Sequence, residues 1–509
     1  MTPGAEPDAT PDATPGAEPG SGFGVDVARL SRELAAAPDG SRLKPLGLGR
    51  VVAGAGALDT LAGVVGELCL PGRDVVVLAA ATPILAGGRD LRALVEMALR
   101  SSSVTWTGAG PAGGLAHADE ATVAAAAAAA AEAGCVVTVG SGTVTDIGKA
   151  AAPAGTPLVT VQTATSVNGY ADPFSVLLRR GVKRTTPSRW PNALIVDPAV
   201  LRDAPPDLNR AGAGDLMGMF TATADWYLAS VITPSPTPAT AGAEEHPGDP
   251  AYHPAVAGLA LARGQRLLAL APRLSPRPDP AALAELADTL TLSGIAMGVA
   301  GSTAPASGLE HAISHLLEMA ATARGQPGNF HGAQVGVASV VAAQTWAHVL
   351  RRVADGGLER PARLPDPDAV RERLGHAFAG LDPSGGMAEE CFADYARKLR
   401  RLAPEGDPAR PLAALRASWA AHRDVLDGML IEPAAVTRVL RAAGLPARFG
   451  DLPEPVDEAT ARWAVATAPL MRQRAGVADL AMLLGAWEEA DVEEVLAAAA
   501  PDDPAAGPR

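Results

Sequence analysis

The sequence has few cysteines, few aromatic residues and no long apolar run, and each shortage excludes a class of protein. Only three cysteines occur among 509 residues (Cys69, Cys135 and Cys391), and they are widely spaced and odd in number. They fit neither a disulfide framework nor a cysteine-based metal site, so we expect a reducing, cytoplasmic location. The longest apolar tract, residues 124–131, is polyalanine, which is too short and too weakly apolar to span a bilayer. The first residues also lack a basic patch followed by an apolar segment, so we expect neither a targeting signal nor a membrane partner.

The charge balance excludes nucleic acid as a partner. There are 42 lysines and arginines against 56 aspartates and glutamates, a formal net charge of −14, and no basic patch with interleaved aromatic residues. Such a chain repels phosphate backbones. The hydrophobic content of 48% is ample for a core, and 509 residues fit two to four domains, with two the commonest outcome.

The first part of the chain predicts an α/β domain over residues 23–200. Short apolar runs alternate with helical patterns there, which indicates a parallel sheet whose carboxyl edge binds ligands. A helix is expected over residues 91–99 and another over the alanine tract. The expected strands are Val75–Leu78, Val104–Thr107, Val136–Val139, Leu158–Val161 and Ala193–Val196.

The rest of the chain predicts a mainly helical domain over residues 201–500, because strand-like runs nearly vanish after Leu201. A loop is expected at 234–254, which is rich in Pro, Ala, Gly and Glu, and a proline-rich connector at 360–367. Disordered tails are expected outside these domains. Residues 1–22, with the repeated hexapeptide TPGAEP, and residues 501–509 have too few apolar side chains to offset the entropy of ordering.

The segment from Val136 to Asp172 has the pattern of a phosphate-binding βαβ unit. A strand ends at Gly140-Ser141-Gly142, a helical pattern begins at once, and a second strand leads into the hydroxyl-rich turn 163–166. Glycine lets a ligand approach the backbone, and the free N–H groups at a helix start favour a pyrophosphate. Taken alone, the same pattern also fits a tight turn with no ligand.

Three histidines lie within 21 residues of the helical half, beside glycine-rich turns. His311 and His315 are four residues apart, so they share one helix face, and His331 follows in the run NFHGAQVG. Asp215 lies in AGDLM, at what we expect to be the start of a long apolar helix. One carboxylate and two or three imidazoles suit zinc, nickel or iron(II), although each residue taken singly also fits a helix cap or a core position.

These motifs together carry a resemblance. The runs GSGTVTDIGK, TATSVNGYADPFSV, GAGDLMGMFTATADW, SGLEHAISH and FHGAQVGVAS resemble the bacterial sn-glycerol-1-phosphate dehydrogenases, within the iron-containing alcohol dehydrogenase and dehydroquinate synthase superfamily. The similarity covers about residues 40–350 and, more weakly, residues 464–485. It implies an NAD- or NADP-dependent enzyme of phospholipid metabolism with one divalent metal (zinc or nickel, with iron as a further option). It also implies a small polyol phosphate as substrate and a homo-oligomer.

The resemblance also assigns roles to particular residues. Asp215, His311 and His331 would hold the metal, although spacing alone leaves His315 open as a ligand. Asn168, Asp215 and His315 would face the substrate and act in catalysis, with His315 relaying the hydroxyl proton. The residues expected at the dinucleotide are Gly140, Ser141, Gly142, Thr143, Val144, Thr145, Thr163, Ala164, Thr165, Ser166 and Asp172.

Two positions depart from the pattern of the family. The family usually has Asp where this chain has Asn168, and Lys four residues after the metal Asp, where this chain has Met219. The first change removes a charge but keeps hydrogen bonding, and the second removes a cation. A phosphorylated substrate would need other cations, for which the sequence offers Lys183, Arg179 and Arg180 without placing them.

The sequence leaves two other functions open. A lyase of the dehydroquinate synthase or cyclitol synthase type would use NAD and a divalent metal on the same scaffold, but it typically has Glu as its first ligand and several basic residues around the phosphate. A non-catalytic nucleotide-binding relative is the second alternative. Net NADH consumption separates the dehydrogenase from the lyase, and metal content separates either enzyme from the non-catalytic relative.

Overall fold

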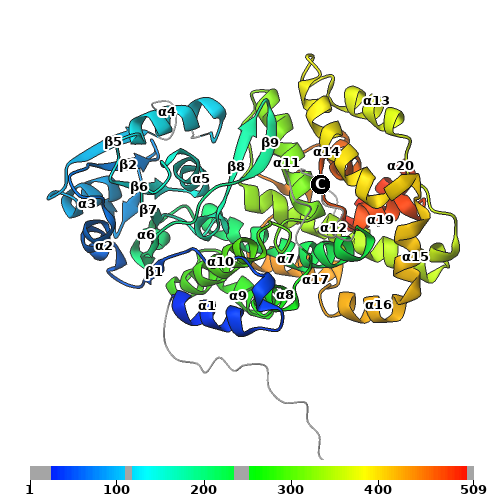
Figure 1. The fold of residues 1–509 in the computed structure, drawn as a ribbon, viewed down its shortest axis with the longest axis horizontal. Coiled ribbons are helices and arrows are strands. Elements are labelled where there is room, and N and C mark those ends of the chain that lie inside the picture. The colour runs from blue at the N-terminus through cyan, green and yellow to red at the C-terminus, as the bar shows by residue number, and fades with distance from the viewer. Residues whose placement is uncertain (1–23, 109–116, 234–250, 501–509) are drawn as a thin grey trace, which may run out of the picture.

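The computed structural model describes residues 24–108, 117–233 and 251–500. The expected tails at 1–22 and 501–509, and most of the expected loop at 234–254, lie outside these residues. Figure 1 shows an α/β region next to a larger helical region, with a two-stranded hairpin between them. The predicted fold class, a parallel-sheet N-terminal domain and a mainly helical C-terminal region, is confirmed.

The α/β region is built on one six-stranded sheet in which every paired strand is parallel. All five predicted strands are present, and a sixth, β1, lies at the edge. In spatial order the strands are β1 (Arg50–Ala53), β10 (Ala193–Val196), β7 (Leu158–Gln162), β6 (Cys135–Gly140), β2 (Val75–Ala79) and β5 (Val104–Gly108). The central strands β6 and β7 are buried along their whole length because helices cover both faces of the sheet.

Two pairs of helices sandwich the sheet. α2 (Leu61–Leu68) and α3 (Leu91–Ala98) pack on one face, against side chains such as Val77 and Val137. α4 (Glu120–Ala130) and α5 (Gly142–Ala151) pack on the other face, with α5 beginning directly after β6. The predicted helices at 91–99 and in the alanine tract are therefore confirmed, and the N-terminus of α5 lies at the carboxyl edge of the sheet.

The hairpin between the two regions was not predicted from the sequence. Its strands are β8 (Phe174–Arg179) and β9 (Val182–Pro187), and a shorter hairpin joins β3 (Leu85–Ala86) to β4 (Arg89–Asp90). The hairpin stands beside α5 on one side and α11 (Leu309–Ala323) on the other (Figure 1). It therefore brings residues of the α/β half next to the helical half.

The described residues after Val196 form no strand, as predicted. The remaining long helices that matter for the site are α7 (Pro206–Ile232), α10 (Pro280–Ala300) and α12 (His331–Ala354). The other helices are α1 (Val27–Ala36), α6 (Pro198–Asp203), α8 (Pro254–Leu261), α9 (Gly264–Leu270), α13 (Pro367–Phe378), α14 (Gly386–Leu402), α15 (Ala409–Ala417), α16 (Trp419–Asp427), α17 (Pro433–Ala442), α18 (Glu458–Thr467), α19 (Val477–Leu483) and α20 (Glu489–Ala499).

Among the described helices, α10 is the one that is long and apolar enough to cross a membrane. However, 83% of its apolar window is buried inside the fold. It packs against Leu194 and Val196 of the sheet edge and against α1, so it is a core helix shared by the two halves.

The expectation that Asp215 lies at the start of its helix is wrong. α7 begins at Pro206, two and a half turns earlier, because proline is well suited to the first helical position and lacks an N–H that would need a partner there. Asp215 is therefore not an N-cap. It lies in the buried middle of the helix, where its carboxylate needs polar partners.

The backbones of α7 and α12 lie very close together where the two helices cross, and this crossing places Asp215 beside His331. A Cβ on Gly214 would lie 2.1 Å from the carbonyl oxygen of Gly332, and one on Gly332 would lie 1.9 Å from the carbonyl oxygen of Ala211. Both contacts are with backbone, which cannot move aside. Only glycine permits this approach of the two helices.

Replacing Gly214 by alanine is expected to lower the free energy of unfolding by about 2–3 kcal/mol, despite the better helix propensity of alanine, because the two backbones must separate. Urea denaturation measures the change. Gly258→Ala is the matched control, since Gly258 is an interior glycine of α8 with no heavy atom within 4 Å of an added Cβ. It should be neutral or stabilising by up to about 1 kcal/mol. Equal effects of the two substitutions would contradict the tight crossing.

Candidate active site

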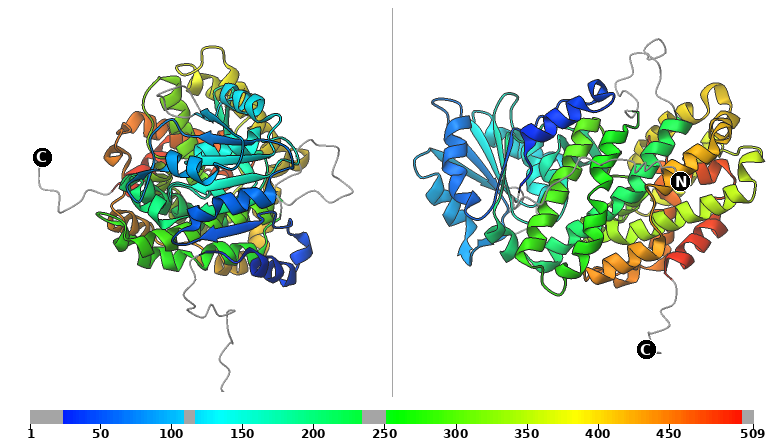
Figure 2. Two further views of the ribbon diagram at one scale, coloured as in Figure 1. Left: turned by 90° about the vertical axis from the view of Figure 1, so that its left-hand side faces the viewer. Right: turned by 90° about the horizontal axis from the view of Figure 1, so that it is seen from below.

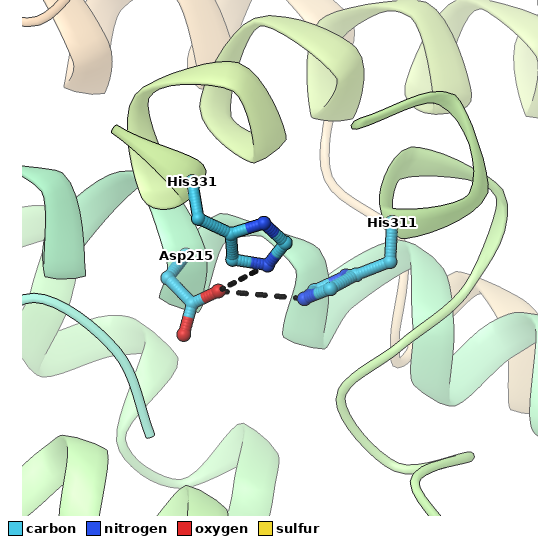
Figure 3. Close-up of side chains that lie close together, drawn as sticks. All are labelled: Asp215, His311 and His331. Carbon is cyan, nitrogen blue, oxygen red and sulfur yellow. Dashed lines mark ion pairs between the residues drawn. The ribbon is translucent and has the colours of Figure 1, made fainter. Parts of the chain in front are cut away.

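The structure brings Asp215, His311 and His331 together in the helical half (Figure 3). Oδ1 of Asp215 lies 3.4 Å from Nε2 of His311 and 3.7 Å from Nε2 of His331. The three residues come from α7, α11 and α12, which pack closely on one another. One ligand atom from each residue lies within 4.8 Å of the other two.

Each imidazole is oriented by a carboxylate behind it. Nδ1 of His311 lies 3.0 Å from Oε1 of Glu310, and Nδ1 of His331 lies 2.6 Å from Oε1 of Glu318. A hydrogen on each Nδ1 leaves the lone pair of each Nε2 directed at Asp215. Carboxylates in this position fix the tautomer and raise the basicity of metal-binding histidines. The donor set therefore fits a divalent cation held by one carboxylate oxygen and two imidazole nitrogens.

The second oxygen of Asp215 is held in place by the backbone. The N–H of Asn168 donates to Oδ2 of Asp215 at 3.1 Å, while the side-chain amide of Asn168 donates to Ser293 Oγ of α10 at 3.1 Å. Asn168, predicted at the substrate, thus lies directly against the Asp–His cluster. Oδ1 of Asp215 remains directed toward the histidines.

Burial and charge set the protonation of the histidines. Burial first, and then the charge of Lys183, hold the pKa of His331 well below its ordinary value, so its imidazole is neutral. Burial also opposes the charged form of His311, but the hydrogen bonds to Asp215 and Glu310 outweigh it and raise its pKa. A cation bound here would displace that proton from His311.

His315 lies beside the cluster and not in it. Its ring centroid is 6.4 Å from that of His311 and 5.6 Å from that of His331. It is buried, and burial, followed by the charges of Lys183 and Arg472, holds its pKa well below the ordinary value. The geometry groups His331, and not His315, with Asp215 and His311.

The glycine turn is linked to this cluster through the hydroxyl-rich loop. A Cβ on Gly142, at the N-terminus of α5, would lie 2.5 Å from Cγ2 of Val167, so the turn and the loop are in contact. The next residue along the loop is Asn168, which contacts Asp215. Ser141 is the N-cap residue of α5, and its side chain does not cap the helix. The free N–H groups of α5 therefore open at the sheet edge, near the three-residue cluster.

Two of the residues expected at the dinucleotide have structural partners. Thr165 is buried and donates both its N–H and its hydroxyl to oxygens of Asn209 of α7, which fixes the loop to that helix. The carboxylate of Asp172 lies 2.9 Å from Nζ of Lys149 and accepts from the N–H of Phe174 at 2.8 Å. The side chains of both residues thus hold the loop in position. Thr163, Ala164 and Ser166 of the same loop interact with the hydroxyl of Tyr170, and they remain predicted at the dinucleotide.

Sequence reasoning missed the two orienting carboxylates and left Lys183 unplaced. Glu310 directly precedes His311, and Glu318 lies seven residues after it, which is two turns along the same helix face. The position of these two glutamates relative to His311 was the sequence feature that could have revealed them. Lys183, on β9, pairs with Glu318 and so reaches the site, whereas Arg180 at the hairpin turn is exposed and pairs with Glu390. Met219 offers no cation; it is buried against Gly264.

The parallel-sheet domain with its glycine turn matches a known class, the iron-containing alcohol dehydrogenases. Residues 52–205 match the family model described as iron-containing alcohol dehydrogenase. Over 89% of its length the chain superposes on the structure of a probable glycerol dehydrogenase from Sinorhizobium meliloti, covering 96% of that chain with a TM-score of 0.53 and 17% identity, which shows a shared fold.

Closer relatives specify the family within this class. The chain is 31% identical over 293 residues to a glycerol-1-phosphate dehydrogenase [NAD(P)+] of Methanothrix thermoacetophila, covering 57% of this chain and 75% of the relative. It is 30% identical over 330 residues to the enzyme of the same name from Bacillus licheniformis, covering 62% of this chain and 77% of the relative. The chain belongs to the glycerol-1-phosphate dehydrogenase family.

Proposed function

We propose that the protein is a metal-dependent, NAD(P)-linked dehydrogenase that interconverts dihydroxyacetone phosphate and sn-glycerol 1-phosphate, or a closely related polyol phosphate. One observation carries the proposal. Two imidazoles, each held at Nδ1 by a carboxylate, direct Nε2 at the same oxygen of Asp215. The 30–31% identical relatives that carry this activity in their names support the substrate class.

The donor set of Asp215, His311 and His331 suits zinc, nickel or iron(II). A bound cation would act as a Lewis acid on the reacting oxygen, and a bound nicotinamide would give or take the hydride. The task of the residues around them is to orient and to exclude water. Glu310 and Glu318 fix the two rings, and Asn168 fixes Asp215 through its N–H.

The dinucleotide is assigned to the edge of the sheet where β6 and β7 end. Gly140, Ser141 and Gly142, with Thr143, Val144 and Thr145 of the first turn of α5, would receive the pyrophosphate on free backbone N–H groups. The loop at 163–166 would line the nicotinamide side. Because this loop contacts Gly142 at Val167 and Asp215 at Asn168, a hydride donor there would face the substrate carbon.

We assign to His315 the transfer of the hydroxyl proton of the substrate. Ketone reduction adds one proton to the oxygen, and alcohol oxidation removes one. The imidazole of His315 is buried next to the ligands, and burial, followed by the charge of Lys183, holds its pKa well below the ordinary value. The ring would therefore be neutral and would pass on the proton released on oxidation without keeping it.

Replacing His315 by alanine is expected to lower kcat about 100-fold while leaving the metal content unchanged, because the proton loses its relay and the ligands stay in place. Steady-state rates between pH 6 and 9 and metal analysis of the same samples provide the measurement. His376→Ala, on the exposed face of α13, is the control. An unchanged rate at every pH would remove His315 from the mechanism.

The experiment that tests the function is oxidation of NADH and of NADPH with dihydroxyacetone phosphate, with zinc, nickel and iron supplied in turn. Stoichiometric oxidation that requires one of the metals supports the dehydrogenase. Turnover of a phosphorylated substrate without net oxidation would identify a lyase that recycles its cofactor.

A further inference from the structure

One face of α7 carries a metal ligand and also the contacts that position a second ligand. Asp215 is followed along this face by Gly218, Thr221 and Asp225, and spacings of three and four residues place side chains above one another on a helix. All four residues are buried. The first turn of α11, which includes His311, lies against the last three of them.

Glycines bring the two helices into direct contact. A Cβ on Gly218 would lie 3.1 Å from Oε1 of Glu310 and 3.2 Å from Cε1 of His311. A Cβ on Gly308, directly before α11, would lie 2.9 Å from Cα of Ala222 of α7. The absence of side chains at these two positions therefore lets Glu310 and His311 pack on the backbone of α7.

Asp225 holds the start of α11. Its Oδ2 accepts the N–H of Leu309, the first residue of that helix, at 3.1 Å. A carboxylate in this position satisfies an N–H group that has no partner within the helix, and it interacts favourably with the helix dipole. Arg472 adds a contact with the same region, because its guanidinium group donates to the carbonyl oxygens of Ser307 and Gly308 at 3.2 Å.

Thr221 connects α7 to the imidazole of His311. Its hydroxyl donates to Oε2 of Glu310 at 2.8 Å, a shorter distance than the 3.4 Å to the carbonyl oxygen of Gly218. Oε1 of Glu310 accepts the N–H of Gly308 at 2.6 Å and lies 3.0 Å from Nδ1 of His311. Both oxygens of this buried carboxylate are therefore held by donors.

These hydrogen bonds tie the positions of two ligands to one helix. Nε2 of His311 lies 3.4 Å from Oδ1 of Asp215, and Asp215 and Thr221 are less than two turns apart on α7. A buried carboxylate oxygen that loses its donor costs free energy unless the group turns toward another partner. If Glu310 turns, the ring of His311 loses the contact that orients it.

We propose that Thr221 is a positioning residue for the metal site, acting on His311 through Glu310. This role rests on the proposed function, which supplies the metal and its ligands, and it assigns a task to a hydroxyl that touches neither. Hydrogen-bond partners behind a metal-binding ring contribute about 10–100-fold to metal affinity. We expect the donor that holds such a partner to contribute at the lower end of this range.

The test is the zinc affinity of the full chain, measured by competition with a chromophoric chelator. Thr221→Val removes the hydroxyl at nearly constant volume and is expected to weaken zinc binding about 10-fold. Thr221→Ser keeps the hydroxyl and should stay within about 3-fold of the unmodified chain. Thr345→Val is the matched control, because Thr345 is buried in α12 and its hydroxyl donates to the carbonyl oxygen of Val341 at 2.9 Å, within its own helix. This control should leave the zinc affinity unchanged.

Urea denaturation of the metal-free proteins separates positioning from a loss of stability. Thr221→Val and Thr345→Val each lose a buried hydroxyl, so both should lower the urea midpoint, but only Thr221→Val should weaken zinc binding. A chain that binds zinc but turns over no polyol phosphate would refute the proposed activity and leave the role of Thr221 standing. Unchanged zinc affinity in Thr221→Val, or an equal loss in Thr221→Ser or in Thr345→Val, would overturn that role. An unmodified chain that binds no zinc would overturn it together with the assignment of the ligands.

Discussion

Replacing Asp215 by asparagine is expected to abolish stable metal binding and to lower the rate at least about 1,000-fold. Asparagine keeps the shape, so the N–H of Asn168 can still donate to the side-chain oxygen. However, the change removes the only anionic ligand and the charge that holds a divalent cation between two imidazoles. Loss of an outer hydrogen-bond partner alone costs such sites 10–100-fold, and loss of a ligand costs more.

Metal analysis after equilibrium dialysis against zinc, together with NADH oxidation, measures both effects. Asp427→Asn, on the exposed face of α16, is the matched control. The folded fraction should stay unchanged, because asparagine has nearly the same volume as aspartate and keeps an oxygen for the N–H of Asn168. An Asp215→Asn protein that retains one zinc and its rate would refute the assignment of the ligands.

Replacing Lys149 by methionine is expected to lower the free energy of unfolding by about 3–5 kcal/mol at pH 8. Nζ of Lys149 lies 2.9 Å from carboxylate oxygens of both Asp146 and Asp172 and donates to the carbonyl oxygen of Gly169 at 2.8 Å. Its side chain is fully buried. Methionine has a similar volume, so the loss comes from two buried carboxylates left without a cation.

The loss should shrink as the pH falls. Burial already raises the pKa of Asp172 to about 6 and raises that of Asp146, even with Lys149 present. Without the lysine, the pKa values of both carboxyl groups rise further. At a pH below these raised pKa values, the two carboxyl groups are protonated in the folded variant, whereas in the unfolded chain they stay ionised down to about pH 4. The folded variant therefore binds more protons than the unfolded chain, and its stability increases as the pH falls from 8 toward 5.

Urea denaturation of Lys149→Met at pH 8 and at pH 5.5 gives the two values. The exposed Lys44 provides the control, since Lys44→Met should cost less than about 0.5 kcal/mol at either pH. A loss that is independent of pH would show that the two carboxylates do not carry the effect.

The central strands of the α/β half could be predicted from the sequence because both of their faces are buried. β2, β6, β7 and β10 are short apolar runs bounded by turn residues, a pattern that few other structures produce. The hairpin was missed for the opposite reason. β9 reads VKRTTP and is half-buried, without a regular alternation of apolar and polar residues.

The position of Asp215 within its helix was misjudged because the glycines around it resemble a turn. In the chain, glycine at 212, 214 and 218 is a sign of flexible backbone. In the fold, these glycines let other backbone segments and side chains approach α7 closely. Nothing local distinguishes the two uses, since the partner residues are distant in sequence.

The candidate metal ligands could be predicted from the sequence, whereas the carboxylates that orient them could not. His311 and His331 stand out because histidine is rare in this chain. Glu310 and Glu318 do not, because glutamate on a helix is ordinary until its histidine partner is located. Arg472 belongs to the same group, since the backbone oxygens of Ser307 and Gly308 that it contacts lie 165 and 164 residues earlier in the chain.

Anomalous diffraction from crystals of the zinc-loaded protein tests the central claim most directly. We predict one strong peak about 2.1 Å from Oδ1 of Asp215 and from Nε2 of His311 and of His331, on the side facing the loop that ends at Asn168. A peak at the other described group of possible ligands (His348, Asp491 and Glu494), with none at Asp215, would contradict the account.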